Sequence, residues 1–420
     1  MRGRVLVSLA FRSLANRRLT AGLTVLSVAV SVALLIGVDR LRTEARASFT
    51  STISGADLIV GARSGPINLL LYSVFRIGDA TNNISWHSYG QIAARTEVAW
   101  TIPISLGDAH RGFRVLGTDS GYFTHYRFGR EQSIEFAEGE VFTRVNDAVL
   151  GADVANALGY AVGDRIIVSH GIGDVSFEHH DELPFLVTGI LRRTGTPVDR
   201  TVHVALAGIE AIHAADPRQY AGQSVDATGT VAGALEPDAV TACIVGLESR
   251  LMVFSLQRFI NEYQREPLMA IVPGVTLQQL WELVGVAETA LLGVSAFVIA
   301  AGLVGLLTTL LTSLAERRRE MAVLRSMGAG PGMVFGLLVA EAIILAGTAA
   351  VAGVTAIHAG MFAARPLVLE RFGLYLAPGP PGWFDGAVVV VVTIAAGVIA
   401  ALPAWRAYRF SLADGLSIRT

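Results

Sequence analysis

Four side chains that could bind a metal ion lie close together in one segment. His170, His179, His180 and Asp181 flank the sequence GIGDVSFE. Imidazole nitrogens and carboxylate oxygens suit Zn²⁺, and a hairpin could bring them together. Adjacent residues on a strand point to opposite faces, however, so His179 and His180 would not both face one site. A polar hairpin tip has the same composition, and both interpretations stay open.

The sequence contains no recognisable catalytic pattern. We find no nucleophile elbow, no HExxH and no GxxxxGK[ST]. All 33 of its Lys and Arg positions are arginine, so this chain cannot supply the lysine with which a P-loop holds phosphate. We therefore expect no enzyme activity and no bound cofactor in this chain.

Long hydrophobic runs make up much of the chain that must position the residues above. An apolar helix of about 20 residues crosses a hydrocarbon core of about 30 Å. Hydrophobic residues make up 52% of the chain and charged residues 16%, against about 25% charged in soluble domains. The net charge of -2 leaves no basic face for nucleic acid. Four runs are long enough to be transmembrane helices: Leu19–Val38, Ala287–Leu314, Met333–Ala359 and Gly386–Trp405.

Arginine placement predicts the orientation. Cytoplasmic loops carry an excess of basic residues, and arginines cluster before the first run, after the second and after the fourth. Both termini are then cytoplasmic, and residues 40–283 lie outside. Arg40, Arg42 and Arg46 are an exception, since they follow the first run on the outer side.

The outer segment has the pattern of a globular α/β domain, which we expect to form two lobes. Short β-branched runs bounded by turn residues predict strands at Ala56–Val60, Phe113–Gly117, Arg165–His170, Pro184–Leu191 and Thr201–Val204. Helices are expected at Asp147–Leu158, Leu206–Ala214 and Leu247–Phe259.

A stalk helix is predicted between this domain and the second run. Apolar residues recur at helical spacing in Thr276–Glu288, and nothing there ends the helix before the run begins. One rod of about 35 residues would extend about 50 Å.

An amphipathic segment, Glu316–Ala329, follows the second run. Its apolar residues Met321, Leu324 and Met327 share one helical face, so it could dock into a partner's groove; a basic loop that obeys the positive-inside rule is the alternative. Glu341 lies inside the third run. A carboxylate inside a membrane is costly, so it marks either a functional site or a packing contact between helices.

Several stretches resemble one family. ERRREMAVLRSMGAGPGMVFGLLVAEAIILAG, which begins at Glu316, resembles the permease domain of FtsX/MacB-type ABC transporters. AFRSLANRRLTAGLTVLSVAVSVALLIGV resembles the first span of that family. VLGTDSGYF, FAEGEVF, VLGADVANALGYAVGDRIIV and FLVTGIL resemble a MacB-like periplasmic core domain, in the expected order. The resemblance implies an α-helical membrane protein with four transmembrane helices and an α/β extracytoplasmic domain.

The resemblance also implies partners. In that family the segment after the second span contacts the ATPase, which places ATPase-coupling residues at Glu316, Arg317, Arg319, Glu320, Leu324, Arg325 and Gly328. The partners would be cytoplasmic ABC ATPase subunits, which hold ATP and Mg²⁺, and a second permease copy or paralogue in a dimer. A membrane-fusion protein, a lipoprotein or a periplasmic protein could join them. MacB carries its ATPase at its N-terminus and this chain does not, so hydrolysis would occur on a separate chain.

The function that the resemblance implies is that of a permease subunit in the bacterial inner membrane. It would transmit ATP-driven motion to its outer domain for the export or extraction of a hydrophobic cargo, such as a lipoprotein, a peptide or a drug. Two alternatives stay open: an FtsX-like signalling subunit that activates a periplasmic hydrolase, and a role in metal handling suggested by the histidines.

The expected domain boundaries follow from these segments. Pro366 and later prolines should break the chain in the outer loop. In order, the parts are residues 1–18 (cytoplasmic amphipathic segment), 19–38 (first span), 39–275 (extracytoplasmic domain), 276–314 (stalk and second span), 315–332 (coupling helix), 333–359 (third span), 360–385 (outer loop), 386–405 (fourth span) and 406–420 (cytoplasmic tail).

Reporter fusions test the orientation. A periplasmic reporter fused after Ala215 should be active and one fused after Gly330 inactive, because the arginine clusters place only the first position outside. The opposite pattern of activities would contradict this topology.

Overall fold

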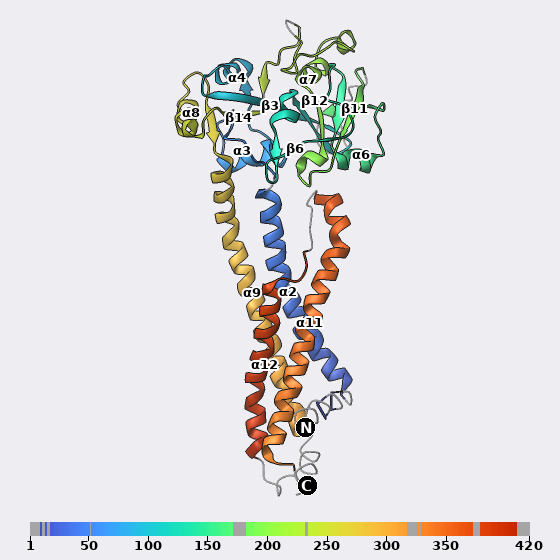
Figure 1. Cartoon of the computed structure of the whole chain (residues 1–420), viewed down its shortest axis with the longest axis vertical. Coiled ribbons are helices and arrows are strands. Elements are labelled where there is room, and N and C mark those ends of the chain that lie inside the picture. Colours follow the sequence, from blue (N-terminus) through green and yellow to red (C-terminus); the bar gives the residue numbers. More distant parts are fainter. Residues whose placement is uncertain are drawn as a thin grey trace. The chain divides into compact units, whose positions relative to one another are not determined.

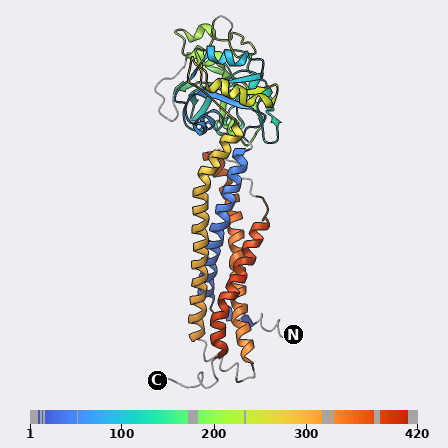
Figure 2. The same cartoon turned by 90° about the vertical axis from the view of Figure 1, so that its left-hand side faces the viewer.

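Long helices and a mixed β-sheet occupy different parts of the chain (Figures 1 and 2). The computed structural model describes residues 9–10, 13–14, 17–50, 52–170, 182–231, 234–316, 326, 329–372 and 379–409. The chain divides into two compact units. We call residues 1–44, 285–367 and 376–420 the helical unit, and residues 45–284 and 368–375 the sheet unit.

Among the residues that the structure describes, four helices are long and apolar enough to cross a membrane, as the hydrophobic runs predict. They are α2 (Arg18–Thr50), α9 (Pro273–Glu316), α11 (Pro331–Phe372) and α12 (Trp383–Arg409). The predicted stalk helix is part of α9, which is unbroken over 44 residues, about 66 Å at 1.5 Å per residue.

The third long helix continues further than the sequence predicts. We expected an outer loop from residue 360, broken at Pro366, but α11 runs through Pro366 and ends at Phe372. Proline removes one backbone hydrogen bond and crowds the carbonyl four residues earlier. The remaining bonds of the helix hold it together here, so the proline does not terminate it.

Small residues let the helices of the helical unit approach closely. Its core contains Ala342, Ala346, Ala396 and Ala400, all fully buried. A Cβ atom at Gly353 would lie 2.6 Å from the carbonyl oxygen of Ala29 on α2. With little difference in hydrophobicity between side chains and lipid tails, such packing is a main source of attraction between helices in a membrane.

The sheet unit is built on one mixed sheet. Its strand order is β15-β1-β14-β3-β4-β12-β8-β11-β7. Two short strands lie off this path: β9 (Arg165–Ile166) pairs with β11, and β10 (Ser169–His170) pairs with β3. The nine strands on the path are β1 (Leu58–Ala62), β3 (Val98–His110), β4 (Phe113–Thr118), β7 (Phe136–Gly139), β8 (Asp147–Leu150), β11 (Phe185–Leu191), β12 (Thr201–Ala205), β14 (Ala242–Leu247) and β15 (Leu268–Ile271).

The long strand β3 joins the two halves of this sheet. Residues 98–104 of β3 pair with β14, and residues 105–110 pair with β4 after the partner changes. We expected two lobes; the two halves instead share a strand and one hydrophobic cluster, which contains Ile59 and Ile102 from one half and Leu116 and Val149 from the other.

Alternating residues of the strands face different helices. In β1, Ile59 packs in the cluster with helix α3 (Pro66–Ser73), whereas Leu58 and Val60 pack with α4 (Trp86–Ala93) and α8 (Val253–Asn261). This is the period of two that a strand buried on both faces requires. In the other half, α6 (Ala152–Leu158) and α7 (Leu206–Ile212) cover the same side as α4 and α8 do.

The predicted elements of this unit are largely present, with three corrections. The single strand expected over Arg165–His170 is instead the two short strands β9 and β10, which pair with β11 and β3. The helix expected over Asp147–Leu158 begins only at Ala152, because Asp147–Leu150 is the fully buried strand β8 between β12 and β11. The helix expected from Leu247 begins at Val253, because Leu247 ends strand β14. In both places, pairing within a buried sheet outweighs local helix propensity.

A glycine opposite a tryptophan offers a test of the packing. Gly246 of β14 lies directly across from Trp100 of β3, and a Cβ atom at Gly246 would lie 2.0 Å from the indole ring. Gly246→Ala should displace the ring and lower the free energy of unfolding by about 1–3 kcal/mol. Gly107→Ala, where the new Cβ meets nothing within 4 Å, is the control. Equal unfolding temperatures for the two purified full-length variants would contradict this account.

Candidate functional site

The predicted ATPase-coupling residues lie at the end of α9 and after it. Glu316 is the last residue of that helix. Arg317, Arg319, Glu320, Leu324, Arg325 and Gly328 lie outside the described residues, so their role stays a prediction.

The predicted metal ligands are only partly described. His170 ends β10, where its backbone lies opposite Asp108 of β3, while His179, His180 and Asp181 lie outside the described residues. Within the part of the chain that the structure describes, no group of three or more His, Cys, Asp or Glu side chains is arranged to hold a metal ion.

Two other histidines of the sheet unit are core residues. His203 of β12 is fully buried among aromatic rings, and burial lowers its pKa to about 3. His110 of β3 lies within hydrogen-bond distance of the Ile167 carbonyl and the Tyr160 hydroxyl, and burial lowers its pKa too. Both imidazoles are therefore neutral at pH 7 and contribute packing and hydrogen bonds.

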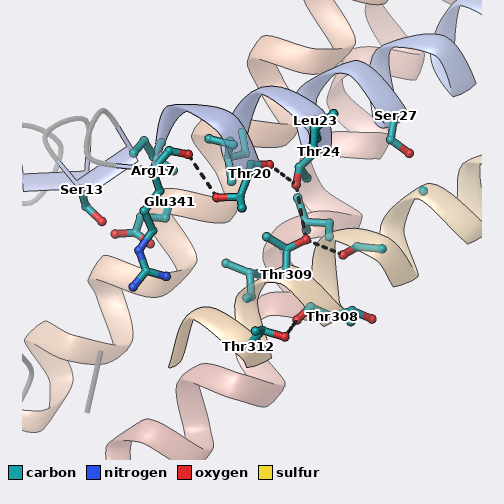
Figure 3. A pocket seen from close by; sticks show the side chains of 17 residues that line it. Ser13, Arg17, Thr20, Leu23, Thr24, Ser27, Thr308, Thr309, Thr312 and Glu341 are labelled. Carbon is teal, nitrogen blue, oxygen red and sulfur yellow. Dashed lines mark hydrogen bonds between the residues drawn. The ribbon is translucent and has the colours of Figure 1, made fainter. Parts of the chain in front are cut away.

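A cavity of about 520 Å³ lies in the helical unit, between the first turns of α2, the last turns of α9 and α11 (Figure 3). Glu341, the predicted intramembrane carboxylate, is 3% exposed and lines this cavity together with Arg17. Figure 3 shows the Arg17 and Glu341 side chains at one end of the cavity and hydroxyl side chains along its length. Glu341 is therefore a buried residue in the wall of this cavity, and whether it marks a functional site or a packing contact stays a prediction.

The hydroxyl groups of this cavity are contributed by two helices. Thr24 of α2 lies 3.4 Å from Thr309 of α9, oxygen to oxygen. Each of these hydroxyls also donates to a carbonyl of its own helix, Thr24 to Thr20 and Thr309 to Gly305. Both hydroxyls are therefore already engaged in hydrogen bonds, with their own helices and with each other.

A set of ion pairs connects the helices at the other end of the helical unit. Arg40 of α2 bonds to Asp385 of α12, which is 2% exposed, and His358 of α11 lies 3.7 Å from the same carboxylate oxygen. Asp385 also accepts the backbone N–H of Gly382 at 2.7 Å and so caps α12. Arg42 of α2 pairs with Glu288 of α9 at 3.0 Å.

Three arginines on the unexpected side of the first hydrophobic run pointed to these ion pairs in the sequence. Arg40, Arg42 and Arg46 violate the positive-inside pattern, and all three have partners: the carboxylates of Asp385 and Glu288, and the ring of Trp281, whose centroid lies 5.4 Å from the Arg46 guanidinium. Sequence reasoning identified the exception but not the partners, which are hundreds of positions away in the chain.

An apolar patch is exposed on the sheet unit. Leu251 is 89% exposed and Phe254 is 75% exposed, next to the half-exposed Met252 and Val275. Phe254 and Val275 line a cavity of about 490 Å³ formed by α8, β15 and the first turns of α9. Exposed apolar surface of this kind typically marks an interaction site.

The Arg40–Asp385 pair can be tested by removing one charge at a time. Asp385→Asn leaves Arg40 without its buried counter-ion and should lower the free energy of unfolding by about 3 kcal/mol. Asp39→Asn, one position from Arg40 and in no ion pair among the described residues, should change it little.

The double variant Arg40→Met/Asp385→Leu removes both charges and should be more stable than Asp385→Asn, because no unpaired buried charge remains. Thermal unfolding of the full-length protein in detergent measures all three. A double variant less stable than Asp385→Asn would show that the pair does not act as a unit.

Comparison with known proteins gives the family. Residues 21–243 match the family model of the MacB-like periplasmic core domain, and residues 292–412 match that of the FtsX-like permease C-terminal domain. No curated protein matches the chain.

Two solved structures are similar to parts of the chain. The periplasmic region of MacB from Actinobacillus actinomycetemcomitans is 10% identical with a TM-score of 0.35, and the alignment covers 55% of this chain and 94% of that one. The extracellular domain of the noncanonic ABC-type transporter YknZ from Gram-positive bacteria is 12% identical with a TM-score of 0.30, over 51% of this chain and 99% of that one. The family models together match most of the sheet unit and most of the long helices, and the first alone matches more than half of the chain. The chain therefore belongs to the FtsX-like permeases of ABC transporters that carry a MacB-like periplasmic core domain.

Proposed function

We propose that this chain transmits ATP-driven motion from a separate ATPase to its sheet unit, for the export or extraction of a hydrophobic cargo. The sheet unit is then periplasmic, both termini are cytoplasmic, and the helices lie in the bacterial inner membrane. ATP and Mg²⁺ are bound by the partner ATPase subunits, since this chain contains no lysine for a P-loop. Two permease chains form the dimer.

The helix α9 is the observation that carries this proposal. It begins at Pro273, directly after strand β15 of the sheet, and ends at Glu316, the first residue of the predicted coupling segment. A single helix is the stiffest connection that a chain can make over this length, because every interior residue is held by hydrogen bonds one turn away. A push on Glu316–Ala329 by the ATPase would therefore be passed along α9.

The apolar patch supports a hydrophobic cargo. Leu251 and Phe254 expose most of their surface to water in the sheet unit, beside a cavity that Phe254 also lines. Covering about 100 Å² of such surface is worth roughly 2.5 kcal/mol at about 25 cal/mol per Å². An acyl chain or an apolar peptide would gain this free energy, whereas a polar solute would not.

Interrupting α9 tests the transmission. The division between the two units falls at Gly285, where an added Cβ would meet nothing within 4 Å. Gly285→Pro removes a helical hydrogen bond and crowds the preceding turn, at a cost of about 3 kcal/mol. Because α11 shows that a helix can continue through a proline, we expect Gly285→Pro to bend α9 rather than end it, and so to weaken the ATP-dependent movement of the sheet unit while the ATPase continues to hydrolyse ATP. Gly285→Ala, which raises helix propensity by about 1 kcal/mol, is the matched control and should keep the movement.

A fluorescent label on Gln219→Cys, an exposed position of the sheet unit, reports the movement in the reconstituted complex. The native Cys243 will not compete for the label, because it is fully buried and burial raises its pKa to about 12. A Gly285→Pro complex that elutes normally and still gives the full ATP-dependent signal would contradict the proposal.

A further inference from the structure

Two buried acceptor atoms beside the Arg40–Asp385 pair have no hydrogen-bond partner among the described residues. They are Oδ1 of Asp385 and Nε2 of His358. The other carboxylate oxygen, Oδ2, is well supplied, since Arg40 and the backbone N–H of Gly382 both donate to it. Native proteins pair the large majority of their buried polar side-chain atoms, so the two remaining acceptors require a donor that they can share.

The backbone of α11 determines which nitrogen of His358 carries the hydrogen when the ring is neutral. Nδ1 lies 2.9 Å from the carbonyl oxygen of Val354, one turn earlier in the same helix. A carbonyl oxygen can only accept, so the hydrogen is on Nδ1 and Nε2 keeps a lone pair. Nε2 lies 3.7 Å from Oδ2 of Asp385. The neutral ring therefore presents an acceptor to a carboxylate that also only accepts, and the two form no hydrogen bond.

A single proton on Nε2 supplies the missing donor. The imidazolium then donates from both nitrogens, from Nδ1 to Val354 as before and from Nε2 to Asp385, whose Oδ1 has its lone pairs unused. A bond between charged partners is about 2.7–2.9 Å long, so the ring and the carboxylate have to approach by about 1 Å. Small rotations of the two side chains provide a shift of this size.

The charges around the cluster favour a proton over a metal ion. Among the described residues, Asp385 is the acidic side chain within ion-pair distance of His358. The other charged residues of α2, α9 and α11 near these contacts form no ion pair with the ring: Asp39, Arg42, Glu44, Glu288 and Arg365. The charges of Arg40 and Asp385 cancel, so a proton leaves the cluster with one positive charge and a divalent cation with two. Two protein ligands are also fewer than the three or four by which proteins hold zinc.

We propose that His358 and Asp385 form a proton-binding site that ties α11 to α2 and α12. With the proton bound, the Asp385 carboxylate accepts from Arg40 of α2, from His358 of α11 and from the backbone N–H that precedes α12. Without the proton, His358 makes no hydrogen bond to the carboxylate. An ordinary imidazole changes its charge between about pH 5 and 8, so the tie forms on mild acidification.

The proton reaches the site from water at this end of the helical unit. The side chains of His358 and Arg40 are 18% and 19% exposed, against 2% for Asp385. In the orientation of the proposed function this water is the periplasm, and acid there would hold the ends of α2, α11 and α12 together and oppose their movement. This regulatory consequence rests on the proposed function, whereas the proton-binding site does not.

Nuclear magnetic resonance of the ¹⁵N-histidine-labelled full-length protein in detergent tests the site without the ATPase. Imidazole nitrogen shifts distinguish a nitrogen that carries a hydrogen from one with a lone pair, and the His358→Gln variant identifies the signals by their absence. We expect a hydrogen on Nδ1 alone at about pH 8 and on both nitrogens at about pH 5.

Three outcomes of this titration would overturn the proposal. The first is a hydrogen on Nε2 alone at the higher pH, and the second is a ring that is still neutral at the lower pH. The third is an Nε2 signal that shifts at the higher pH on addition of Zn²⁺ and returns with a chelator, because this would show a metal site instead.

Substitutions of the two partners should shift proton uptake in opposite directions. Asp385→Asn removes the anion that stabilises the imidazolium and should weaken proton binding at least about tenfold, the factor for one hydrogen bond between charged partners. Arg40→Met removes the competing cation and should strengthen proton binding by a similar factor, and it remains a test if Asp385→Asn does not fold. Shifts in the same direction would show only a general disturbance of the helices and would overturn the assignment.

The reconstituted complex with the ATPase tests the regulatory consequence. The ATP-dependent signal of the label on Gln219→Cys should fall between about pH 8 and pH 5 in the chain that keeps His358, and much less in His358→Gln. His87→Gln removes an exposed histidine of the sheet unit that forms no ion pair among the described residues, and this matched control should keep the full pH dependence. A bound proton without this pH effect would overturn the regulatory consequence alone. A complex with no ATP-dependent signal at any pH would instead contradict the proposed function.

Discussion

Charge pairing on α2 is the interaction on which the arrangement of the helical unit depends. Arginine cannot lose its charge in a protein, so Arg40 and Arg42 each need water or a counter-ion where the helix leaves the apolar region. The structure gives them carboxylates on two other helices, Asp385 of α12 and Glu288 of α9. The small side chains of Ala342, Ala346 and Ala396 let the helices approach closely. The ion pairs add charge contacts that link α2 to α12 and to α9 at one position along each helix.

The sheet unit uses a different constraint, the continuity of β3. A strand that pairs with β14 over its first half and with β4 over its second half holds both halves of the sheet in one register. The partner change is accompanied by a register shift between Leu106 and Ala109, where Gly107 lies, and an extra residue of this kind bends and twists a strand. The shared hydrophobic cluster on one side of the sheet follows from this strand, because residues from both halves then face the same helix α3 and helix α5 (Gly121–His125).

The spans and many strands could be predicted from the sequence, because hydrophobic length and β-branched runs are local signals. Strand β3 was missed because Pro103 and Gly107 interrupt its pattern, and the extension of α11 was missed because a proline is read as a helix end. Asp147–Leu150 was assigned to a helix because its burial depends on strands distant in the sequence. The cavity around Glu341 could not be predicted for the same reason. The third run suggested a functional carboxylate, but the other residues of the cavity are distant in the sequence: Arg17 directly precedes α2, and Thr309 belongs to α9. The coupling residues and the histidine hairpin remain predictions.

The wide sequence separation of the Arg40–Asp385 pair has a consequence for biosynthesis. The two residues are 345 positions apart, and ribosomes add about 5–20 residues per second. In the proposed orientation Arg40 must therefore remain on the far side of the membrane for roughly 20–70 s before its counter-ion has been synthesised. During that interval α2 has only water, lipid head groups or an insertion factor to stabilise its outer end. Newly made chains that stall before α12 should accordingly be preferred substrates for membrane quality-control proteases.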